Sequence, residues 1–394
     1  MFKLRLEMAT LVLPAAIVGA AIFSATPAQA QSDSSSSSSS EAGLAAPQDV
    51  PVYWNAERLK GAKPILPAPS KVGPDGLPEA SQLVSPQLKI SPEAAKGEKG
   101  EGAAPSLQLE PSAEKQLFPR QETTLSEETI IVPQMTSSFG AHFTTSRVFP
   151  DSILTVYPYT TFGKLYFTDP KAGNFQCSAT VLRPRIIATA GHCVTHPSTN
   201  PADRYFFTNF LFIPAFNSGA APLKTWTSSQ QWVANAWYFS NGSVPNEQDV
   251  AMLIANDQVI NGKVTKLGTV TGWVGYFTNQ LANNNVTMFG YPCNLDACLR
   301  EQYTNAQTFA SGGSNTFTYG SAMRGGASGG GWIQDFGVAS ASNPHIDGLG
   351  ANYLVAVTSY GPIATEPKYL GASNFDARFL DVLSHACGSN PGNC

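Results

Sequence analysis

The chain has 394 residues, with 24 basic and 28 acidic side chains and a formal net charge of −4 at pH 7. Residues 148–394 hold 13 acidic and 12 basic side chains, so no basic surface is expected there and nucleic acid is not an expected partner. The length exceeds one average domain, and composition indicates which part can build a core.

The first 30 residues have the layout of a secretory signal peptide. Two basic residues precede an apolar run over residues 9–23, and Ala28-Gln29-Ala30 supplies the small residues that a signal peptidase needs. An uncleaved anchor helix is the alternative, but the run is short for a span of about 20 residues and contains Pro14. We expect cleavage after Ala30, no stable membrane insertion afterwards, and a secreted or periplasmic protein.

A low-complexity region covers residues 31–147. It opens with a serine run and continues through frequent prolines to the charged stretch KGEKGE at 96–101. This composition buries too little apolar surface to offset chain entropy, which predicts a mostly extended leader or pro-region, with a permanent linker as the alternative. Val52-Tyr53-Trp54 is its one aromatic cluster, and it could dock the leader on the downstream domain.

The composition changes at about residue 148. Short runs rich in β-branched and aromatic residues alternate with Gly, Pro and Asn, which predicts many short strands in a barrel or sandwich. The expected strands are 162–168, 178–182, 186–189, 205–213, 250–254, 286–289, 307–310, 331–333 and 353–358. Only residues 375–386 have apolar residues at helical spacing. The span has room for one large β domain or two smaller barrels.

Six cysteines lie in the same region, in close pairs separated by 16, 5 and 7 positions. An even number in an exported chain indicates disulfides. Local pairing is the simplest of the possible connectivities, and it joins Cys177 to Cys193, Cys293 to Cys298, and Cys387 to Cys394. No Cys-x-x-Cys or Cys/His cluster indicates a metal, so neither a metal nor an organic cofactor is expected.

Three stretches could carry nucleophilic catalysis. TAGHC contains His192, DVAML begins with Asp249, and GASGG surrounds Ser328. A serine hydroxyl attacks a carbonyl well only when a neighbouring base accepts its proton and a buried carboxylate holds that base in the correct tautomer. The chain supplies one residue of each kind, in the order His, Asp, Ser.

These stretches resemble the chymotrypsin-like serine proteases. The segment CSATVLRPRIIATAGHCV is similar to the histidine region of that family, in which a Cys before the strand pairs with the Cys after the histidine. QDVAMLI is similar to the family's Asp-Ile-Ala-Leu-Leu stretch, GGASGG to its Gly-Asp-Ser-Gly-Gly, and TSYG at 358–361 to its Ser-Trp-Gly strand. The resemblance covers about residues 150–387 and is nearest to the bacterial branch that includes glutamyl endopeptidases.

The resemblance implies an all-β fold of two six-stranded antiparallel barrels with a C-terminal helix, in a protease domain at 148–394. It implies a secreted serine endopeptidase that cleaves polypeptide substrates through an acyl-enzyme, with His192 as general base, Asp249 as its orienter and Ser328 as nucleophile. Gly326 and Ser328 would supply the N–H groups of the oxyanion hole. The implied substrate-binding residues are Ala322, Thr358, Ser359, Tyr360 and Gly361.

The chain departs from this family at Ala327, where most members have an aspartate that pairs with a new N-terminal amine after zymogen cleavage. A cut after Arg147 would expose Val148, but position 327 offers no acidic partner. We therefore expect activation by removal of the leader or by unblocking of the cleft.

The residues at the positions that set substrate specificity in this family also differ from the family pattern. Ala322 stands where relatives that cleave after basic residues have Asp, and Thr358 stands where glutamyl endopeptidases have His. A small or medium apolar residue before the scissile bond is the expected preference. Binding of an acidic side chain by Arg324, which replaces a family cysteine, is the alternative.

Other interpretations of these residues stay open. Asp203 or Asp257 could replace Asp249, and Ser328 could belong to a flexible Gly-Ser linker. GASGG also fits the nucleophile elbow of α/β-hydrolases, with Asp376 and His385 following it, although consecutive glycines begin a helix poorly. A catalytically silent binding module on the same scaffold is the contrasting class. The histidines without a supporting motif are His142, His196, His345 and His385.

Overall fold

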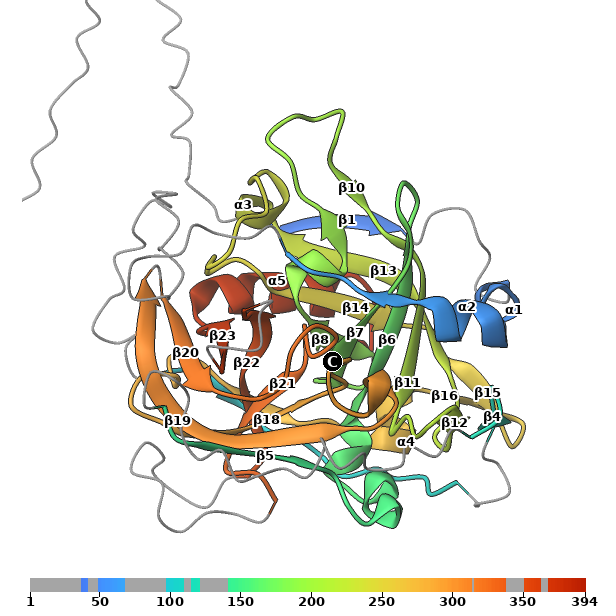
Figure 1. The fold of residues 1–394 in the computed structure, drawn as a ribbon. Coiled ribbons are helices and arrows are strands. Elements are labelled where there is room, and N and C mark those ends of the chain that lie inside the picture. Colours follow the sequence, from blue (N-terminus) through green and yellow to red (C-terminus); the bar gives the residue numbers. More distant parts are fainter. Residues whose placement is uncertain are drawn as a thin grey trace, which may run out of the picture. The chain divides into compact units, whose positions relative to one another are not determined.

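The computed structural model describes residues 37–41, 49–67, 97–109, 115–120, 141–313, 315–337, 351–362 and 368–394 (Figure 1). The expected signal peptide at 1–30 and His345 lie outside these ranges. No helix among the described residues is long and apolar enough to cross a membrane.

The first barrel consists of six antiparallel strands. Its ladder runs β13-β11-β6-β7-β8-β14 and closes because β14 also pairs with β13. The strands are β6 (Phe162–Asp169), β7 (Gly173–Val181), β8 (Ile186–Thr189), β11 (Thr208–Pro214), β13 (Trp226–Ala234) and β14 (Ala251–Ala255). All residues of β8 and β14 are buried, as expected for short apolar strands that are covered on both faces.

The second barrel also has six antiparallel strands. Its ladder runs β21-β18-β19-β20-β23-β22 and closes through the pairing of β21 with β22. The strands are β18 (Asn285–Gly290), β19 (Gln302–Gly313), β20 (Thr316–Gly320), β21 (Gly331–Gln334), β22 (Tyr353–Tyr360) and β23 (Tyr369–Ser373). Trp332, Tyr353 and Met288 are fully buried inside it, so each barrel has its own core.

The only helix longer than six residues in the described part of the chain is α5 (Ala377–Gly388), two residues later at each end than the predicted 375–386. Asp376 caps its N-terminus by accepting a hydrogen bond from the Arg378 N–H, and its apolar face packs on β13 and β14. The shorter helices and strands of this part are α3 (Asn235–Tyr238), α4 (Leu267–Thr271), η4 (Asp151–Thr155), η5 (Tyr159–Thr161), η6 (Gly191–Cys193), η7 (Asp296–Cys298), β9 (Thr195–His196), β10 (Tyr205–Phe206), β12 (Ala220–Ala221), β15 (Gln258–Ile260), β16 (Lys263–Thr265) and β17 (Gly275–Phe277).

Segments that precede residue 148 add short strands to the sheets of the barrels and to one small separate sheet, that of β12. β1 (Ser37–Glu41) pairs with β13, β2 (Lys63–Pro64) with β7, β3 (Lys99–Gly100) with β17, β4 (Lys115–Gln116) with β12, and β5 (Phe143–Arg147) with β19. Two helices, α1 (Val50–Tyr53) and α2 (Ala56–Gly61), also form here, which differs from the mostly extended conformation expected for 31–147. The reason is local clustering, because Val50, Trp54, Leu59 and Ala62 are buried together against the first barrel, while Val52 stays exposed.

Candidate active site

His192 and Asp249 meet at the ends of two paired strands. His192 lies in η6 directly after β8, and Asp249 lies two residues before β14, which pairs with β8. The Asp249 carboxylate therefore contacts His192 twice, with Oδ2 at 2.8 Å from Nδ1 and Oδ1 accepting the backbone N–H at 2.8 Å. Both side chains are buried, with exposed fractions of 4% for His192 and 0% for Asp249.

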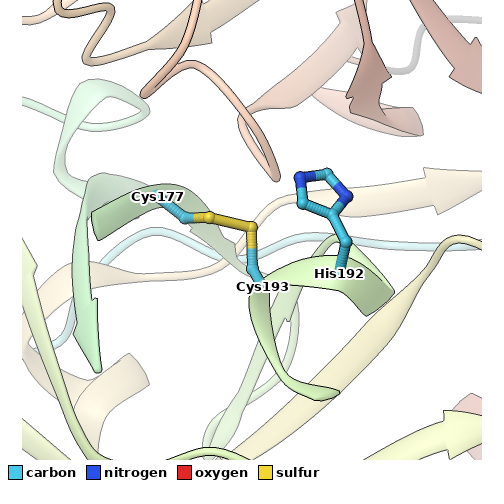
Figure 2. A group of neighbouring side chains, drawn as sticks. All are labelled: Cys177, His192 and Cys193. Atoms are coloured by element: carbon cyan, nitrogen blue, oxygen red, sulfur yellow. A yellow bond between two sulfur atoms is a disulfide. The ribbon is translucent and has the colours of Figure 1, made fainter. Parts of the chain in front are cut away.

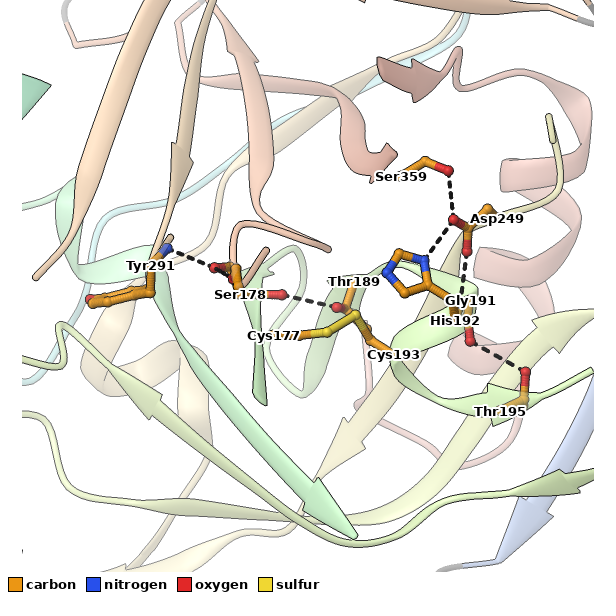
Figure 3. The surroundings of a disulfide bond; sticks show 11 residues. Cys177, Ser178, Thr189, Gly191, His192, Cys193, Thr195, Asp249, Tyr291 and Ser359 are labelled. Carbon is orange, nitrogen blue, oxygen red and sulfur yellow. Dashed lines mark hydrogen bonds and ion pairs between the residues drawn. A yellow bond between two sulfur atoms is a disulfide. The ribbon is translucent and has the colours of Figure 1, made fainter. Parts of the chain in front are cut away.

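A third donor completes the surroundings of Asp249. Ser359 Oγ on β22 donates to Oδ2 at 2.5 Å, as Figure 3 shows. The Nε2 atom of His192 is buried and has no hydrogen-bond partner within the described ranges. An imidazole whose Nδ1 faces a carboxylate presents Nε2 as its proton acceptor, so the arrangement supplies an oriented base with a free basic atom.

Ser328 lies in the loop that enters β21, and its backbone is tied to both barrels. Its carbonyl accepts the Ser178 N–H of β7 at 2.7 Å, and the next residue, Gly329, donates to the Thr358 carbonyl of β22 at 2.8 Å. Ser328 is 7% exposed. The glycine-rich stretch is thus a buried, hydrogen-bonded loop, which contradicts the flexible-linker interpretation.

Two N–H groups of this loop are left free. The carbonyl of the peptide that precedes Gly326 accepts the Cys293 N–H at 2.7 Å, and that of the peptide that precedes Ser328 accepts the Gly330 N–H at 2.9 Å. In a trans peptide the N–H points opposite to the carbonyl, so the N–H groups of Gly326 and Ser328 point away from these partners. Neither N–H has a backbone acceptor within the residues described.

Position 326 requires glycine. Its φ is +100°, a region that side chains rarely adopt, and a Cβ there would lie 2.5 Å from the Tyr291 carbonyl oxygen. The loop therefore folds this way only with glycine at 326.

Both barrels contribute to this constellation, the first holding the histidine–aspartate pair and the second holding the serine loop, with α5 following the second. The fold is chymotrypsin-like.

Solved structures of bacterial proteases are similar to this chain. The protease Anisep from Arthrobacter nicotinovorans is 25% identical over 58% of this chain and 96% of its own, with a TM-score of 0.48. The thermostable serine protease AL20 from an extremophilic microorganism is 23% identical over 61% and 100%, with a TM-score of 0.48. A Glu endopeptidase is 18% identical over 61% and 95%, with a TM-score of 0.45. The two closed barrels, rather than these scores, establish the chymotrypsin-like fold.

Comparisons of sequence alone give no relative. No protein-family model matches the chain. No curated protein matches it either.

Several alternative site residues have other partners in this chymotrypsin-like fold. Asp257 forms an ion pair with Arg185 at 2.6 Å, and Asp203 accepts a hydrogen bond from Asn200, so His192 is oriented by Asp249. The chain after Ser328 enters the strand β21, which contradicts the α/β-hydrolase elbow because that motif needs a helix there.

The acid and the base that the α/β-hydrolase interpretation requires, Asp376 and His385, also have other hydrogen-bond partners, at the C-terminal helix. Asp376 caps α5 and pairs with Arg378, and His385 bonds the carbonyl of Asp381 on the same helix. His142 and His196 are exposed, and no hydrogen bond is described for either side chain.

A cavity of about 200 Å³ opens beside Ser328. Four predicted residues line it, namely Thr358, Ser359, Tyr360 and Gly361, and Arg324 is also in its wall. Ala322, which was predicted with them, does not line this cavity and packs against the second core instead. Thr358 Oγ1 accepts the Trp332 Nε1–H at 2.9 Å, so this hydroxyl is engaged inside the barrel.

Three disulfides join the pairs that the spacing predicts, Cys177–Cys193, Cys293–Cys298 and Cys387–Cys394. The first lies next to His192, and one ligand atom from each of Cys177, Cys193 and His192 falls within 4.8 Å of the others (Figure 2). Metal ligation requires thiolates, and these two sulfurs are bonded to each other. The cluster therefore ties β7 to the turn that carries His192.

The bond between Arg147 and Val148, where a cut would expose a new N-terminus, is held within the structure. Arg147 pairs with Asp296, and the Val148 N–H donates to the Glu301 carbonyl at 3.0 Å. Ala327 is fully buried and carries no polar side-chain atom.

Proposed function

We propose that the chain is an exported serine endopeptidase. Ser328 Oγ attacks the substrate carbonyl while His192 Nε2 accepts the hydroxyl proton, and the tetrahedral oxyanion is bound by the Gly326 and Ser328 N–H groups. His192 then donates that proton to the leaving amine as the C–N bond breaks, which leaves an acyl group on Ser328. Water, deprotonated by the same imidazole, hydrolyses this ester. No metal or organic cofactor takes part in this scheme.

The observation that carries the proposal is the double contact of Asp249 with His192. One carboxylate oxygen binds the ring Nδ1 and the other binds the backbone N–H of the same residue, while Nε2 stays unpaired. A structural histidine in a core would instead have both ring nitrogens satisfied. A base that is oriented in this way beside a glycine-rich serine loop supports acyl transfer.

Labelling with a fluorophosphonate probe tests the proposal. After the leader has been removed by limited proteolysis, the folded chain is exposed to the probe, and mass spectrometry locates the adduct. We expect the label on Ser328, and none after Ser328→Ala or after denaturation. Ser384→Ala is the matched control, because this serine is exposed on α5 and its loss should leave labelling unchanged. An unlabelled but folded chain would favour the silent binding module.

We further propose that residues 49–67 form a pro-segment that covers the cleft. Trp54 is 4% exposed, its Nε1–H donates to the Asn209 carbonyl at 2.6 Å, and it packs against Tyr166 with ring centroids 5.4 Å apart. Farther on, the Gln176 side chain donates to the Ala62 carbonyl at 3.0 Å. These contacts anchor the segment on the first barrel beside β7.

From this anchor the segment continues to the proposed nucleophile. Pro64 and Leu66 lie against Gly325, and with Pro67 they line the same cavity as Ser328. A substrate that enters this cavity would have to displace them. The geometry supports activation by release of the segment, without a new ion pair at position 327.

Two substitutions in the pro-segment test this. Trp54→Ala removes the buried anchor and should raise the activity of the uncleaved chain, whereas Val52→Ala, at a side chain that is 78% exposed, should not. Cleavage of a quenched peptide library and thermal unfolding are measured for both variants. An uncleaved chain that is already as active as the processed one would exclude the covering role.

For specificity we propose a small or medium apolar residue before the scissile bond, since the part of the cavity wall that lies outside the pro-segment includes Thr358, Gly361 and Leu370. The peptide library decides this directly. A strong preference for glutamate would contradict the proposal and would assign Arg324, which also lines the cavity, to recognition of the acidic side chain.

A further inference from the structure

Ser178 on β7 makes four hydrogen bonds where the two barrels meet. Its Oγ donates to the Gly326 carbonyl at 2.8 Å and accepts the Tyr291 N–H at 2.9 Å. Its backbone N–H donates to the Ser328 carbonyl at 2.7 Å, and its carbonyl accepts Thr189 Oγ1 at 2.9 Å. Figure 3 shows Ser178 between Tyr291 and Thr189. The side chain is 1% exposed, so these bonds are sheltered from water.

We propose that Ser178 is a positioning residue that orders the oxyanion hole. The inference rests on the proposed endopeptidase function. The two N–H groups assigned to the hole, those of Gly326 and Ser328, flank one central peptide, Gly326–Ala327. A contact that fixes the plane of this peptide therefore also fixes the directions of the Gly326 and Ser328 N–H groups.

Both polar groups of the central peptide are anchored. Its carbonyl is held by Ser178 Oγ, and its N–H, on Ala327, donates to the Arg324 carbonyl at 3.0 Å. A rotation of the peptide would break both bonds and leave a buried carbonyl unpaired, which is unfavourable because the carbonyl cannot recover a hydrogen bond from water. At a glycine the backbone resists such rotation little, so the hydroxyl of Ser178 supplies the resistance that residue 326 lacks.

The neighbourhood explains why a hydroxyl is needed. Ala327 is buried without a polar side-chain atom, so the loop has no carboxylate of its own to hold it. Ser178 is also adjacent in sequence to Cys177, whose disulfide with Cys193 leads directly to His192. One strand therefore sets the positions of the serine loop and of the histidine turn together.

Tyr291 fixes the Ser178 hydroxyl through a second hydrogen bond. Its N–H donates to Ser178 Oγ, and its buried hydroxyl lies 3.0 Å from the Phe216 carbonyl and 3.3 Å from Glu301 Oε2. Because both ends of Tyr291 are engaged, the Ser178 hydroxyl has a fixed acceptor lone pair and its proton is directed at Gly326.

Kinetics of Ser178→Ala test the inference, with Thr180→Val as the matched control. Thr180 lies on the same strand, is equally buried, and has a hydroxyl with no hydrogen-bond partner among the described residues. The full chain and each variant are produced in the same way, freed of the leader by the same limited proteolysis, and assayed with the quenched peptide library. Affinities are measured for a peptidyl boronic acid, which forms a tetrahedral adduct, and for a product peptide, which does not.

We expect Ser178→Ala to lower kcat about 10- to 100-fold, less than the loss of a direct oxyanion donor, with KM changed less than about 2-fold. Boronate affinity should fall in parallel with kcat/KM while product affinity stays constant, and Thr180→Val should behave as the unsubstituted chain. Ser178→Thr, which keeps the hydroxyl, should recover most of the kcat and remains informative if the alanine variant does not fold.

Three results would overturn the inference. One is an unchanged kcat in Ser178→Ala, another is an equal loss in the alanine and threonine variants, and the third is an equal fall of boronate and product affinity. Ser328→Ala separates these from failure of the proposed function. If Ser328→Ala retains activity, the endopeptidase assignment fails, whereas an inactive Ser328→Ala beside a fully active Ser178→Ala refutes the role of Ser178 alone.

Discussion

The two barrels hold their parts of the candidate site by different means. In the first barrel a side-chain network orders the site, because Asp249 accepts three hydrogen bonds and fixes the His192 ring. In the second barrel the Ser328 loop is ordered almost entirely through its backbone, with glycines at the positions that tolerate no Cβ.

The difference follows from what each part has to do. A base needs one ring in one orientation and tautomer, which a carboxylate can impose. An oxyanion hole needs N–H groups that stay unpaired until charge develops, and only a loop whose carbonyls are engaged elsewhere can offer them without reorganisation. Substitutions in the network around Asp249 and His192 should therefore act on proton transfer, and substitutions that touch the Ser328 loop should act on backbone geometry, whichever barrel carries the residue.

The largest effect on kcat is expected for Asp249→Asn, which disrupts the hydrogen bonds between Asp249 and His192. The amide fits the same space but presents a donor to Nδ1 and favours the wrong imidazole tautomer, so kcat should fall about 10⁴-fold with little change in KM. Steady-state kinetics and thermal unfolding check this. A loss explained entirely by unfolding would remove the distinction between the two barrels.

Gly326→Ala disturbs the backbone conformation of the Ser328 loop. A Cβ at φ +100° would lie 2.5 Å from the Tyr291 carbonyl, so the loop must shift and kcat should fall about 100-fold, the size of one lost oxyanion donor. Gly173→Ala is the control, because Gly173 has φ +105° but nothing within 4 Å of the added Cβ. The prediction is wrong if both variants lose the same activity.

Ser359→Ala should have a smaller effect. It removes one of the three donors to the Asp249 carboxylate and leaves both contacts to His192, so we expect about a 10-fold lower kcat. Ser373→Ala loses a similarly buried hydroxyl that donates to the Asn246 carbonyl and has no other hydrogen bond among the described residues, and it should change kcat less than about 2-fold. Equal kcat for the two variants would show that the third donor is dispensable.

The smallest effect concerns stability against pH. Burial raises the pKa of Glu301 to about 8, partly offset by its hydrogen bond to Tyr291. The folded chain therefore retains a proton that the unfolded chain releases, and this contribution to stability is complete below about pH 4 and is lost as the pH rises through about 8. Lys164, whose pKa burial lowers, acts in the opposite sense.

Glu301→Gln cannot titrate and should flatten the fall in the free energy of unfolding between about pH 5 and 8. Urea unfolding at three pH values in this window measures the slope. The same slope in both proteins would mean that Glu301 is already ionised in the folded state.

Much of the barrel architecture could be predicted from apolar runs. The predicted 186–189 coincides with β8, and 331–333 and 353–358 lie inside β21 and β22. β13 was missed because its centre, Ser228–Gln231, is polar, and β20 and β23 were missed because they are short and rich in Thr, Gly and Ser. Barrel closure buries such strands whatever their composition.

The candidate site was predictable as far as local motifs reach. The stretches around His192, Asp249 and Ser328 carried enough context to indicate those residues, and the structure brings His192 and Asp249 into contact. The bond from Ser359 to Asp249 and the bonds of Ser178 to Gly326, Ser328 and Tyr291 left no signal in the sequence, because they join residues of different barrels. Burial of Trp54 was indicated only by the aromatic cluster that contains it.

The disulfide between Cys177 and Cys193 has a consequence for where the protein can work. It links the strand of Ser178, which hydrogen-bonds the Ser328 loop, to the turn of His192, and this covalent link forms only on oxidation. In a reducing cytoplasm that link would be open. For the proposed exported enzyme, oxidation of this cysteine pair would therefore be a condition for a fully ordered site, and a reduced chain would lack the covalent bond that holds the His192 turn.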